Sequence, residues 1–292
     1  MKLLLTVFLV LLCGCTHKRS ELGTADNPIK FYFVPSVDVR LLEDTSKALK
    51  TYLEAHTPWK YKISIPQSYI AIVEAFGTNR ADIASLNTYG YIIAHEKYGV
   101  EARLMTERFG DRVYQAQFLA RSDSGIKKIE DINGKKMAFV DPASISGYLL
   151  PLKYLNDHHI KPKETVFAMK HDNVVTMVYQ GQVDAGVTFY SPPNEGQIQD
   201  ARRLVKAQFP DVEQKVKIIG LSSDIPNDPI IFRKDMPEEM KQKICIEMIK
   251  FAKTIDGQRV LKQLSSVTGL VPTTDKDYDE TRAAVKALGG IK

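Results

Sequence analysis

The chain has 292 residues, of which 44% are hydrophobic and 26% are charged, and its net charge is +5. This length predicts about two domains, and the apolar fraction excludes a globally disordered chain. The long apolar run at residues 3–12 is too short for a bilayer span, which excludes a protein with several membrane spans. Three cysteines cannot form a disulfide scaffold. The basic excess is mild, and the chain lacks the dense Lys/Arg clusters that are typical of nucleic-acid-binding proteins.

The N-terminus has the pattern of an export signal. Lys2 precedes the apolar run, and small residues follow it, as in a cleaved signal peptide. Residues 12–15, Leu-Cys-Gly-Cys, resemble a bacterial lipobox, which implies removal of residues 1–14 and acylation of Cys15. Acyl chains would hold the protein on a membrane surface, with the polar residues 15–28 as a tether.

Strand and helix patterns then alternate along the chain. Runs typical of strands occur at 29–35, 61–66, 81–86, 113–121, 136–140, 164–169, 183–189 and 216–221. Helical spacing of apolar residues occurs at 39–54, 69–77, 91–98, 147–158, 173–180, 237–254, 257–269 and 277–288. This alternation predicts an α/β fold with largely parallel sheets.

The same order of elements predicts two units rather than one. A second α/β unit begins near residue 120, and two extended crossings join it to the first. We therefore expect a clamshell in which residues 29–117 and 222–292 form lobe 1 and residues 118–221 form lobe 2. In such folds a ligand binds at the carboxyl ends of the strands, in the crevice between the lobes.

The segment that follows the strand at 136–140 is the most informative one for chemistry. Ser144, Ile145 and Ser146 come after the strand and directly before a helix. A helix start offers free N–H groups and the positive end of the dipole, so this segment is either an anion site or an ordinary serine cap. No P-loop lysine pattern accompanies it, so nucleotide hydrolysis is not indicated.

Six segments carry a resemblance to a known family. They are residues 67–76 (QSYIAIVEAF), 81–84 (ADIA), 121–135 (RSDSGIKKIEDINGK), 144–151 (SISGYLLP), 183–186 (VDAG) and 225–235 (IPNDPIIFRKD). Over about residues 29–270 the chain resembles the PhnD-type phosphate-, phosphite- and phosphonate-binding lipoproteins of ABC importers. The resemblance implies a type II periplasmic-binding-protein clamshell with a mixed sheet in each lobe and two crossing strands as hinge. It also implies a small oxyanion ligand and an ABC permease as partner.

The family holds its oxyanion with a Ser-Thr-Ser run that opens a helix in the second lobe. The resemblance places this role on Ser144, Ile145 and Ser146. Ile145 stands where the family has threonine, which removes one hydroxyl donor and leaves the backbone N–H. A buried phosphoryl group needs several convergent donors, each worth about 1.5–3 kcal/mol, so the loss matters.

Four further positions follow from the resemblance. Tyr69, Tyr114, His171 and Asp228 match two tyrosines, a histidine and an aspartate that line the family's site. In aminophosphonate binders, this aspartate and a glutamate hold the ligand's ammonium group. The glutamate position falls near Ser191, where this chain has no carboxylate, so the ammonium site is incomplete.

One more tyrosine is a candidate from its position alone. Tyr89 and Tyr91 both follow the strand at 81–86, where the crevice is expected. The sequence does not choose between them, and we include Tyr91 among the site residues. Adjacent His158 and His159 at a helix end are poorly placed to share a metal ion, and Cys245 fits a helix core. No paired carboxylates, activated cysteine or Ser-His-Asp set stands out, so we expect no enzyme activity, no cofactor and no metal.

The sequence leaves two other functions open. The changes at Ile145 and near Ser191 are compatible with a binding protein for a different solute, either a carboxylate or a larger organic ligand. A sensory lipoprotein that partners a membrane kinase has the same features. We expect a monomer in the cell envelope that acts outside the cytoplasm.

Overall fold

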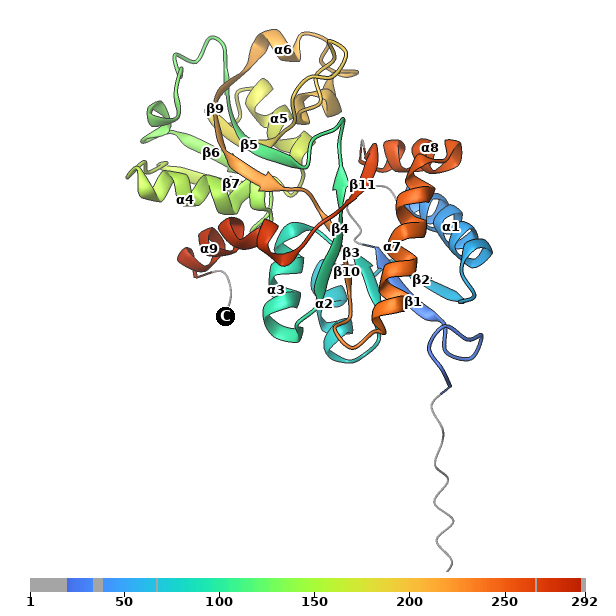
Figure 1. The fold of residues 1–292 in the computed structure, drawn as a ribbon. Coiled ribbons are helices and arrows are strands. Elements are labelled where there is room, and N and C mark those ends of the chain that lie inside the picture. Colours follow the sequence, from blue (N-terminus) through green and yellow to red (C-terminus); the bar gives the residue numbers. More distant parts are fainter. Residues whose placement is uncertain (1–19, 34–38, 67, 266, 290–292) are drawn as a thin grey trace, which may run out of the picture.

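The structure is a computed structural model, which describes residues 20–33, 39–66, 68–265 and 267–289. The predicted signal peptide and Cys15 lie outside the described residues. No helix within the described ranges is long and apolar enough to cross a membrane. The described elements form two α/β units, each built on its own sheet (Figure 1).

The first unit contains a six-stranded sheet with the order β11-β4-β10-β3-β1-β2. Its strands are β1 (Ile29–Phe33), β2 (Tyr61–Ser64), β3 (Ile83–Ser85), β4 (Glu101–Glu107), β10 (Pro229–Phe232) and β11 (Gly269–Pro272). β1 pairs in parallel with β2 and β3, whereas β10 and β11 run antiparallel to their neighbours. The helices of this unit are α1 (Val39–His56), α2 (Tyr69–Gly77), α3 (Thr88–Tyr98), α7 (Glu238–Lys253) and α8 (Ile255–Ser265).

The second unit contains a five-stranded sheet with the order β7-β6-β8-β5-β9. Its strands are β5 (Val113–Arg121), β6 (Lys136–Phe139), β7 (Glu164–Phe167), β8 (Ala185–Tyr190) and β9 (Val216–Pro226). β6 runs parallel to β7 and β8, and β5 runs antiparallel to β8 and β9. Its helical segments are η1 (Ile129–Ile132), η2 (Ile145–Leu149), α4 (Leu150–Asp157), α5 (His171–Tyr179), η3 (Ala201–Val205) and α6 (Val212–Lys215).

Both sheets are therefore mixed, as the family resemblance implies, and the expectation of largely parallel sheets is wrong. The sequence patterns miss the strands β4, β10 and β11, all of which pair antiparallel in the first sheet. The partners of these antiparallel strands lie far away in the chain. The alternation of helices and strands along the sequence therefore does not reveal them. The predicted lobe boundaries fall inside β5 and β9 and stay a prediction.

Two crossings connect the units and lie side by side. The first runs from β4 to β5 through a tight turn at residues 108–111, in which Phe109 and Gly110 have φ of 54° and 89°. The second runs from β9 to β10, and the backbone N–H of Asn227 donates to the carbonyl of Arg112 at 3.0 Å. The Asn227 side chain also donates to the carbonyl of Asp111 at 3.0 Å. These bonds hold the crossings in fixed register.

The C-terminal segment reinforces this junction. It comprises η4 (Asp275–Tyr278) and α9 (Asp279–Ala287), and α9 packs beside α4 of the second unit (Figure 1). The Tyr278 hydroxyl donates to the carbonyl of Asn227 at 3.1 Å, and Arg112 donates to the carbonyl of Pro272 at 2.9 Å. Residues 272–287 therefore contact the second unit as well as the crossings.

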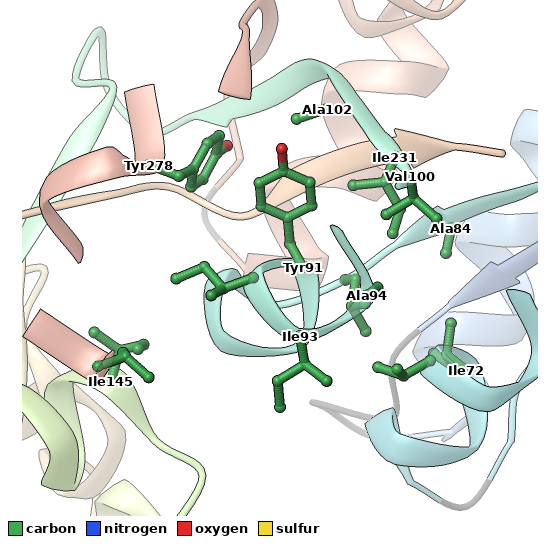
Figure 2. Packing of buried hydrophobic residues seen from close by; sticks show 14 of the residues in the cluster. Ile72, Ala84, Tyr91, Ile93, Ala94, Val100, Ala102, Ile145, Ile231 and Tyr278 are labelled. Atoms are coloured by element: carbon green, nitrogen blue, oxygen red, sulfur yellow. The ribbon is translucent and has the colours of Figure 1, made fainter. Parts of the chain in front are cut away.

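Buried apolar side chains also join the two units. One cluster gathers residues of α2 and α3 with Ile145, Leu149 and Leu150 of the second unit. Figure 2 shows Ile145 in this cluster together with Tyr91 and Tyr278. Burial of apolar surface at this contact stabilises the arrangement in which the units lie against each other.

Candidate ligand-binding site

In each sheet, residues with polar or charged side chains lie at one edge. In the first sheet, Tyr69 and Tyr89 follow the carboxyl ends of parallel strands, and β10 begins directly after Asp228. Because β4 runs antiparallel to β10, its carboxyl end brings Arg108 to the same edge. Ligands of open α/β sheets bind outside the carboxyl ends of the strands, so this edge is a candidate site.

The second sheet presents a matching edge. Ser144 follows β6, and His171 follows β7, which is parallel to it. β5 is antiparallel to β8, so Tyr114 at the start of β5 lies level with the carboxyl end of β8. Tyr114 also pairs with Ile225 of β9, next to the second crossing.

The helix that opens at residues 145–149 begins with a π turn and continues directly into α4. Ser144 caps it, because its Oγ accepts the N–H of Gly147 at 2.9 Å. A Cβ on Gly147 would lie 2.5 Å from Val140 Cβ, so only glycine lets the helix start this close to the end of β6. The first N–H groups of a helix have no intrahelical acceptor, so those of Ile145 and Ser146, which the Ser144 side chain does not cap, can donate to an anion.

The three residues of the run differ in what they offer. Ser146 is only 3% exposed, and its hydroxyl opposes the rise in the pKa of Tyr114. The Ile145 side chain is buried in the cluster between the units, so only its backbone N–H can face a ligand. Isoleucine at this position therefore lacks the hydroxyl donor of threonine but makes apolar contact with the first unit.

Arg108 and Asp228 lie beside Tyr114. Arg108 Nη2 is 3.1 Å from Asp228 Oδ2, and Arg108 Nη1 donates to Asn227 Oδ1 at 2.6 Å. The guanidinium carbon of Arg108 is 6.0 Å from the centre of the Tyr114 ring. Burial and the Asp228 carboxylate raise the pKa of Tyr114, while Arg108 and Ser146 oppose the rise. Tyr114 therefore stays protonated and can donate a hydrogen bond.

Tyr69 connects the two edges. Its ring centre lies 6.2 Å from that of Tyr89. Burial, then Tyr89 and Asp141, raise the pKa of Tyr69 to about 12. Tyr69 also packs against the buried cluster that contains Ile145 and Leu149, so it lies at the contact between the two units. The hydroxyl of Tyr69 is thus a neutral donor at physiological pH.

His171 opens α5, and its ring packs edge-on to Phe189 of β8 with centres 5.0 Å apart. Its Nδ1 is buried and makes no hydrogen bond with any described residue. Burial lowers the pKa of His171 to about 4, against a smaller opposing effect of Asp172. The neutral ring can donate one N–H and accept at the other nitrogen.

Together these residues supply several hydrogen-bond donors. The hydroxyls of Tyr69, Tyr114 and Ser146 and the N–H groups of the helix start are neutral donors that suit an oxyanion. Arg108 adds positive charge, which Asp228 compensates. Among the described residues, no group of three or more His, Cys, Asp or Glu side chains is placed to hold a metal ion.

Comparison with known proteins decides the family. A family model described as "ABC transporter, phosphonate, periplasmic substrate-binding protein" matches residues 31–278. The chain belongs to this family. The family and the two-unit fold expected from the resemblance are confirmed, and this phosphonate-binding-protein family consists of substrate-binding components of importers.

Individual members of the phosphonate-binding-protein family are moderately similar. The phosphate-import protein PhnD of Mycolicibacterium smegmatis is 26% identical over 280 residues, which cover 89% of this chain and 85% of that protein. The phosphonates-binding periplasmic protein of Escherichia coli is 27% identical over 239 residues, covering 76% and 68%. The structure of PhnD1 from Prochlorococcus marinus with methylphosphonate superposes with a TM-score of 0.72 at 15% identity, covering 90% and 98%.

The structure places Tyr91 in the core. It is fully buried, and its hydroxyl donates to Asp275 Oδ1 at 2.5 Å, so its predicted role in the site stays a prediction. Tyr89 lies about 200° away around the same helix, and its ring lies beside that of Tyr69. Sequence spacing alone does not decide which face of α3 turns toward Tyr69.

Sequence reasoning also missed Arg108, Arg203 and Asp141. Arg108 follows β4. Because the sequence patterns do not predict this strand, they could not place Arg108 at the sheet edge. Arg203 lies on η3, and the burial of its Nε without a hydrogen bond depends on tertiary packing. Asp141 stands three residues before the Ser144 cap, and its position after a strand was the one available signal.

Proposed function

We propose that this protein binds a small phosphoryl oxyanion, namely phosphate, phosphite or a small phosphonate, between its two units and delivers it to an ABC permease. The observation that carries the proposal is the buried Ser146 at the start of the helix that Ser144 caps. The names of the relatives support the ligand class, since they specify phosphate import, phosphonate binding and a methylphosphonate complex.

The proposed site consists of residues from both sheet edges. We assign ligand contacts to the hydroxyls of Tyr69, Tyr114 and Ser146, to the N–H groups that follow Ser144, including that of Ile145, and to the ring of His171. Asp228 takes part through its pair with Arg108. Because all the direct donors are neutral, binding remains reversible, as delivery to a permease requires.

Closure of the two units is the step that links binding to transport. A ligand held by Tyr69 of one unit and Ser146 of the other adds contacts that exist only when the units meet. Such contacts shift the population toward the closed form, which is the form that a permease can distinguish. The protein itself changes no covalent bond in this cycle, so no enzyme activity is part of the proposal.

We further propose that the protein is a monomer anchored in the cell envelope through acylated Cys15. The lipobox-like residues 12–15 support this anchoring. A Cys15→Ser variant should move from the membrane fraction to the soluble fraction of cells. Retention of that variant in the membrane fraction would exclude Cys15 as the anchor.

The ligand is tested by calorimetric titration of the full-length protein in detergent. The protein is unfolded and refolded first, so that no copurified ligand occupies the site. Phosphate, phosphite, methylphosphonate and 2-aminoethylphosphonate are added in turn. Tight binding of at least one of them is expected, and the absence of heat and of competition with all four would refute a phosphoryl ligand.

A further inference from the structure

Residues 20–28, within the predicted tether, form a folded loop on the first unit, here called the N-terminal loop. The N–H of Gly23 donates to the carbonyl of Asn27 at 2.8 Å, and the Asn27 side chain donates to the carbonyl of Ser20 at 2.8 Å. The N–H of Lys60 donates to the carbonyl of Gly23 at 2.8 Å. Because Lys60 directly precedes β2, these bonds hold Ser20 close to the edge strand of the first sheet.

Trp59 packs on the N-terminal loop beside an open cavity. Gly23 has φ of 90°, and a Cβ there would lie 2.5 Å from Trp59 Cδ1, so only glycine lets the loop lie this close to the indole. Trp59 and Leu22 are partly buried and pack against the core cluster of the first unit. Together with Pro58 they line a cavity of about 350 Å³ between the loop and residues 58–60. The indole is therefore held rigidly while part of its surface stays exposed.

The exposed charges around this cavity balance one another. Glu21 and Asp26 of the N-terminal loop are exposed, and so are Lys60 and Lys62 at the start of β2. The surface therefore carries no basic excess that would call for an anionic partner. An indole combines a large apolar ring with one N–H donor, and tryptophan is enriched at the headgroup level of membranes for this reason. The chemistry of the surface fits the interface of a lipid bilayer.

The length of chain before the N-terminal loop places a bilayer close to this surface. Cys15, the proposed lipid attachment point, precedes Ser20 by only five residues, which span at most about 18 Å when fully extended. A small domain is about 30 Å across, so this reach is shorter than the first unit itself. The loop lies at an end of the first unit that faces away from the second unit (Figure 1). That end must therefore stay beside the lipid.

We propose that the surface formed by Trp59, Leu22 and Pro58 rests on the bilayer to which Cys15 is attached, with the indole at the headgroup level. This inference rests on the proposed acylation of Cys15. The N-terminal loop lies at the amino ends of β1 and β2, whereas the candidate ligand site lies beyond the carboxyl ends of the parallel strands. The folded loop therefore holds the protein in one orientation, with the ligand site on the side of the first sheet away from the lipid.

The test measures tryptophan fluorescence of the full-length, acylated protein in phosphatidylcholine vesicles. The chain has a single tryptophan, so selective excitation of tryptophan reports on Trp59 alone. Vesicles whose acyl chains carry bromine should quench this emission relative to the same vesicles without bromine, because bromine quenches only by close contact. The emission maximum should also lie at a shorter wavelength than that of the Cys15→Ser protein in water.

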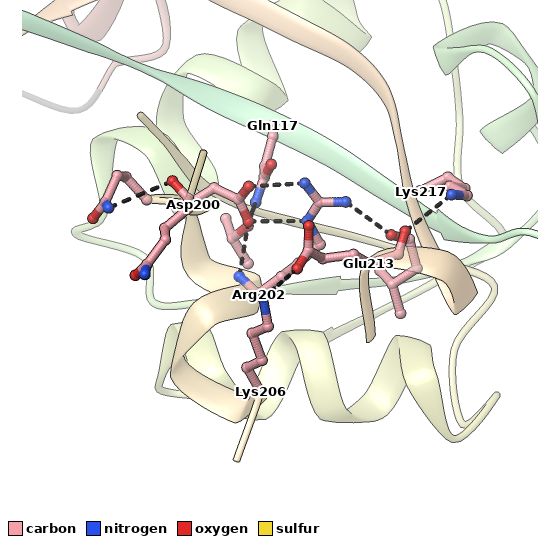
Figure 3. A network of polar contacts seen from close by, with 10 residues as sticks. Gln117, Asp200, Arg202, Lys206, Glu213 and Lys217 are labelled. Carbon is pink, nitrogen blue, oxygen red and sulfur yellow. Dashed lines mark hydrogen bonds and ion pairs between the residues drawn. The ribbon is translucent and has the colours of Figure 1, made fainter. Parts of the chain in front are cut away.

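The matched control moves the single tryptophan to the second unit. Trp59→Phe combined with Leu204→Trp places it on η3, where Leu204 is 48% exposed. Arg202 donates to the two oxygens of Asp200 at 3.0 Å and 2.8 Å, and these bonds fix the short helix (Figure 3). Bromine should leave the emission of this variant unchanged. If the variant fails to fold, the Cys15→Ser protein added to the same vesicles supplies the unquenched reference.

Flotation of the vesicles on a density gradient separates the possible failures. If the wild-type protein floats with the vesicles but bromine quenches Trp59 no more than the control, the inference is refuted and anchoring through Cys15 stands. If bromine quenches the Cys15→Ser protein as strongly as the wild type, the short tether does not hold Trp59 on the lipid, and the inference is refuted as well. If the wild-type protein does not float, the anchoring and the inference are both refuted, and the calorimetric test of the phosphoryl ligand is unaffected.

Discussion

Replacement of Ser146 by alanine isolates the donor on which the proposed site depends. Ser146 is only 3% exposed, so its surroundings leave little access for water to replace the hydroxyl when it is removed. A hydrogen bond to a charged acceptor is worth about 1.5–3 kcal/mol, which corresponds to about a 10- to 150-fold increase in Kd. Ser146→Ala should therefore weaken phosphate or methylphosphonate binding by a factor in this range.

A double-mutant cycle with Tyr114→Phe shows whether the two hydroxyls act on the same ligand. If both donate to one oxyanion, the combined loss should differ from the sum of the single losses, because residues in contact couple by about 0.5–3 kcal/mol. The assay is calorimetric titration of the four proteins, with urea unfolding to measure stability separately. Ser124→Ala, an exposed serine after β5, serves as the matched control.

One result would refute this reasoning. If Ser146→Ala lowers the free energy of unfolding but leaves ligand affinity unchanged, the role of the Ser146 hydroxyl is purely structural. The phosphoryl group would then have to bind elsewhere, and the helix start at residues 145–149 would lose its proposed role.

Three other predictions test neighbouring features. The pKa of His171 is lowered to about 4 from 6.5, so the unfolded chain binds more protons between these values and stability should fall as pH drops through them, by about 2–3 kcal/mol. His171→Gln should flatten this pH dependence in urea unfolding, and equal slopes would contradict a buried neutral ring. Gly147→Ala places a Cβ 2.5 Å from Val140 Cβ and should cost about 1–3 kcal/mol in urea unfolding and weaken ligand binding; unchanged values would exclude the close helix–strand contact. Tyr91→Phe should cost about 1 kcal/mol of stability but leave ligand affinity unchanged, and a large loss of affinity would return Tyr91 to the site.

Much of the fold follows from local patterns. Periodicity locates α1, α2, α4, α7 and most parallel strands, because each buries one face or a short apolar run. Periodicity does not reveal the antiparallel strands β4, β10 and β11, because their pairing joins segments that are more than a hundred residues apart. For the same reason Arg108, at the end of β4, could not be placed by pattern.

The sequence by itself determined that two α/β units are present, that a hydroxyl-rich turn opens a helix at Ser144, and which family the chain resembles. These features are local, because strand ends, caps and helix starts depend on neighbouring residues. The tertiary structure alone decided that Tyr89 rather than Tyr91 turns toward Tyr69, and that Asp228 is paired with Arg108. Each of these depends on the relative rotation of packed helices and on the crossing of strands between units, which no local spacing encodes.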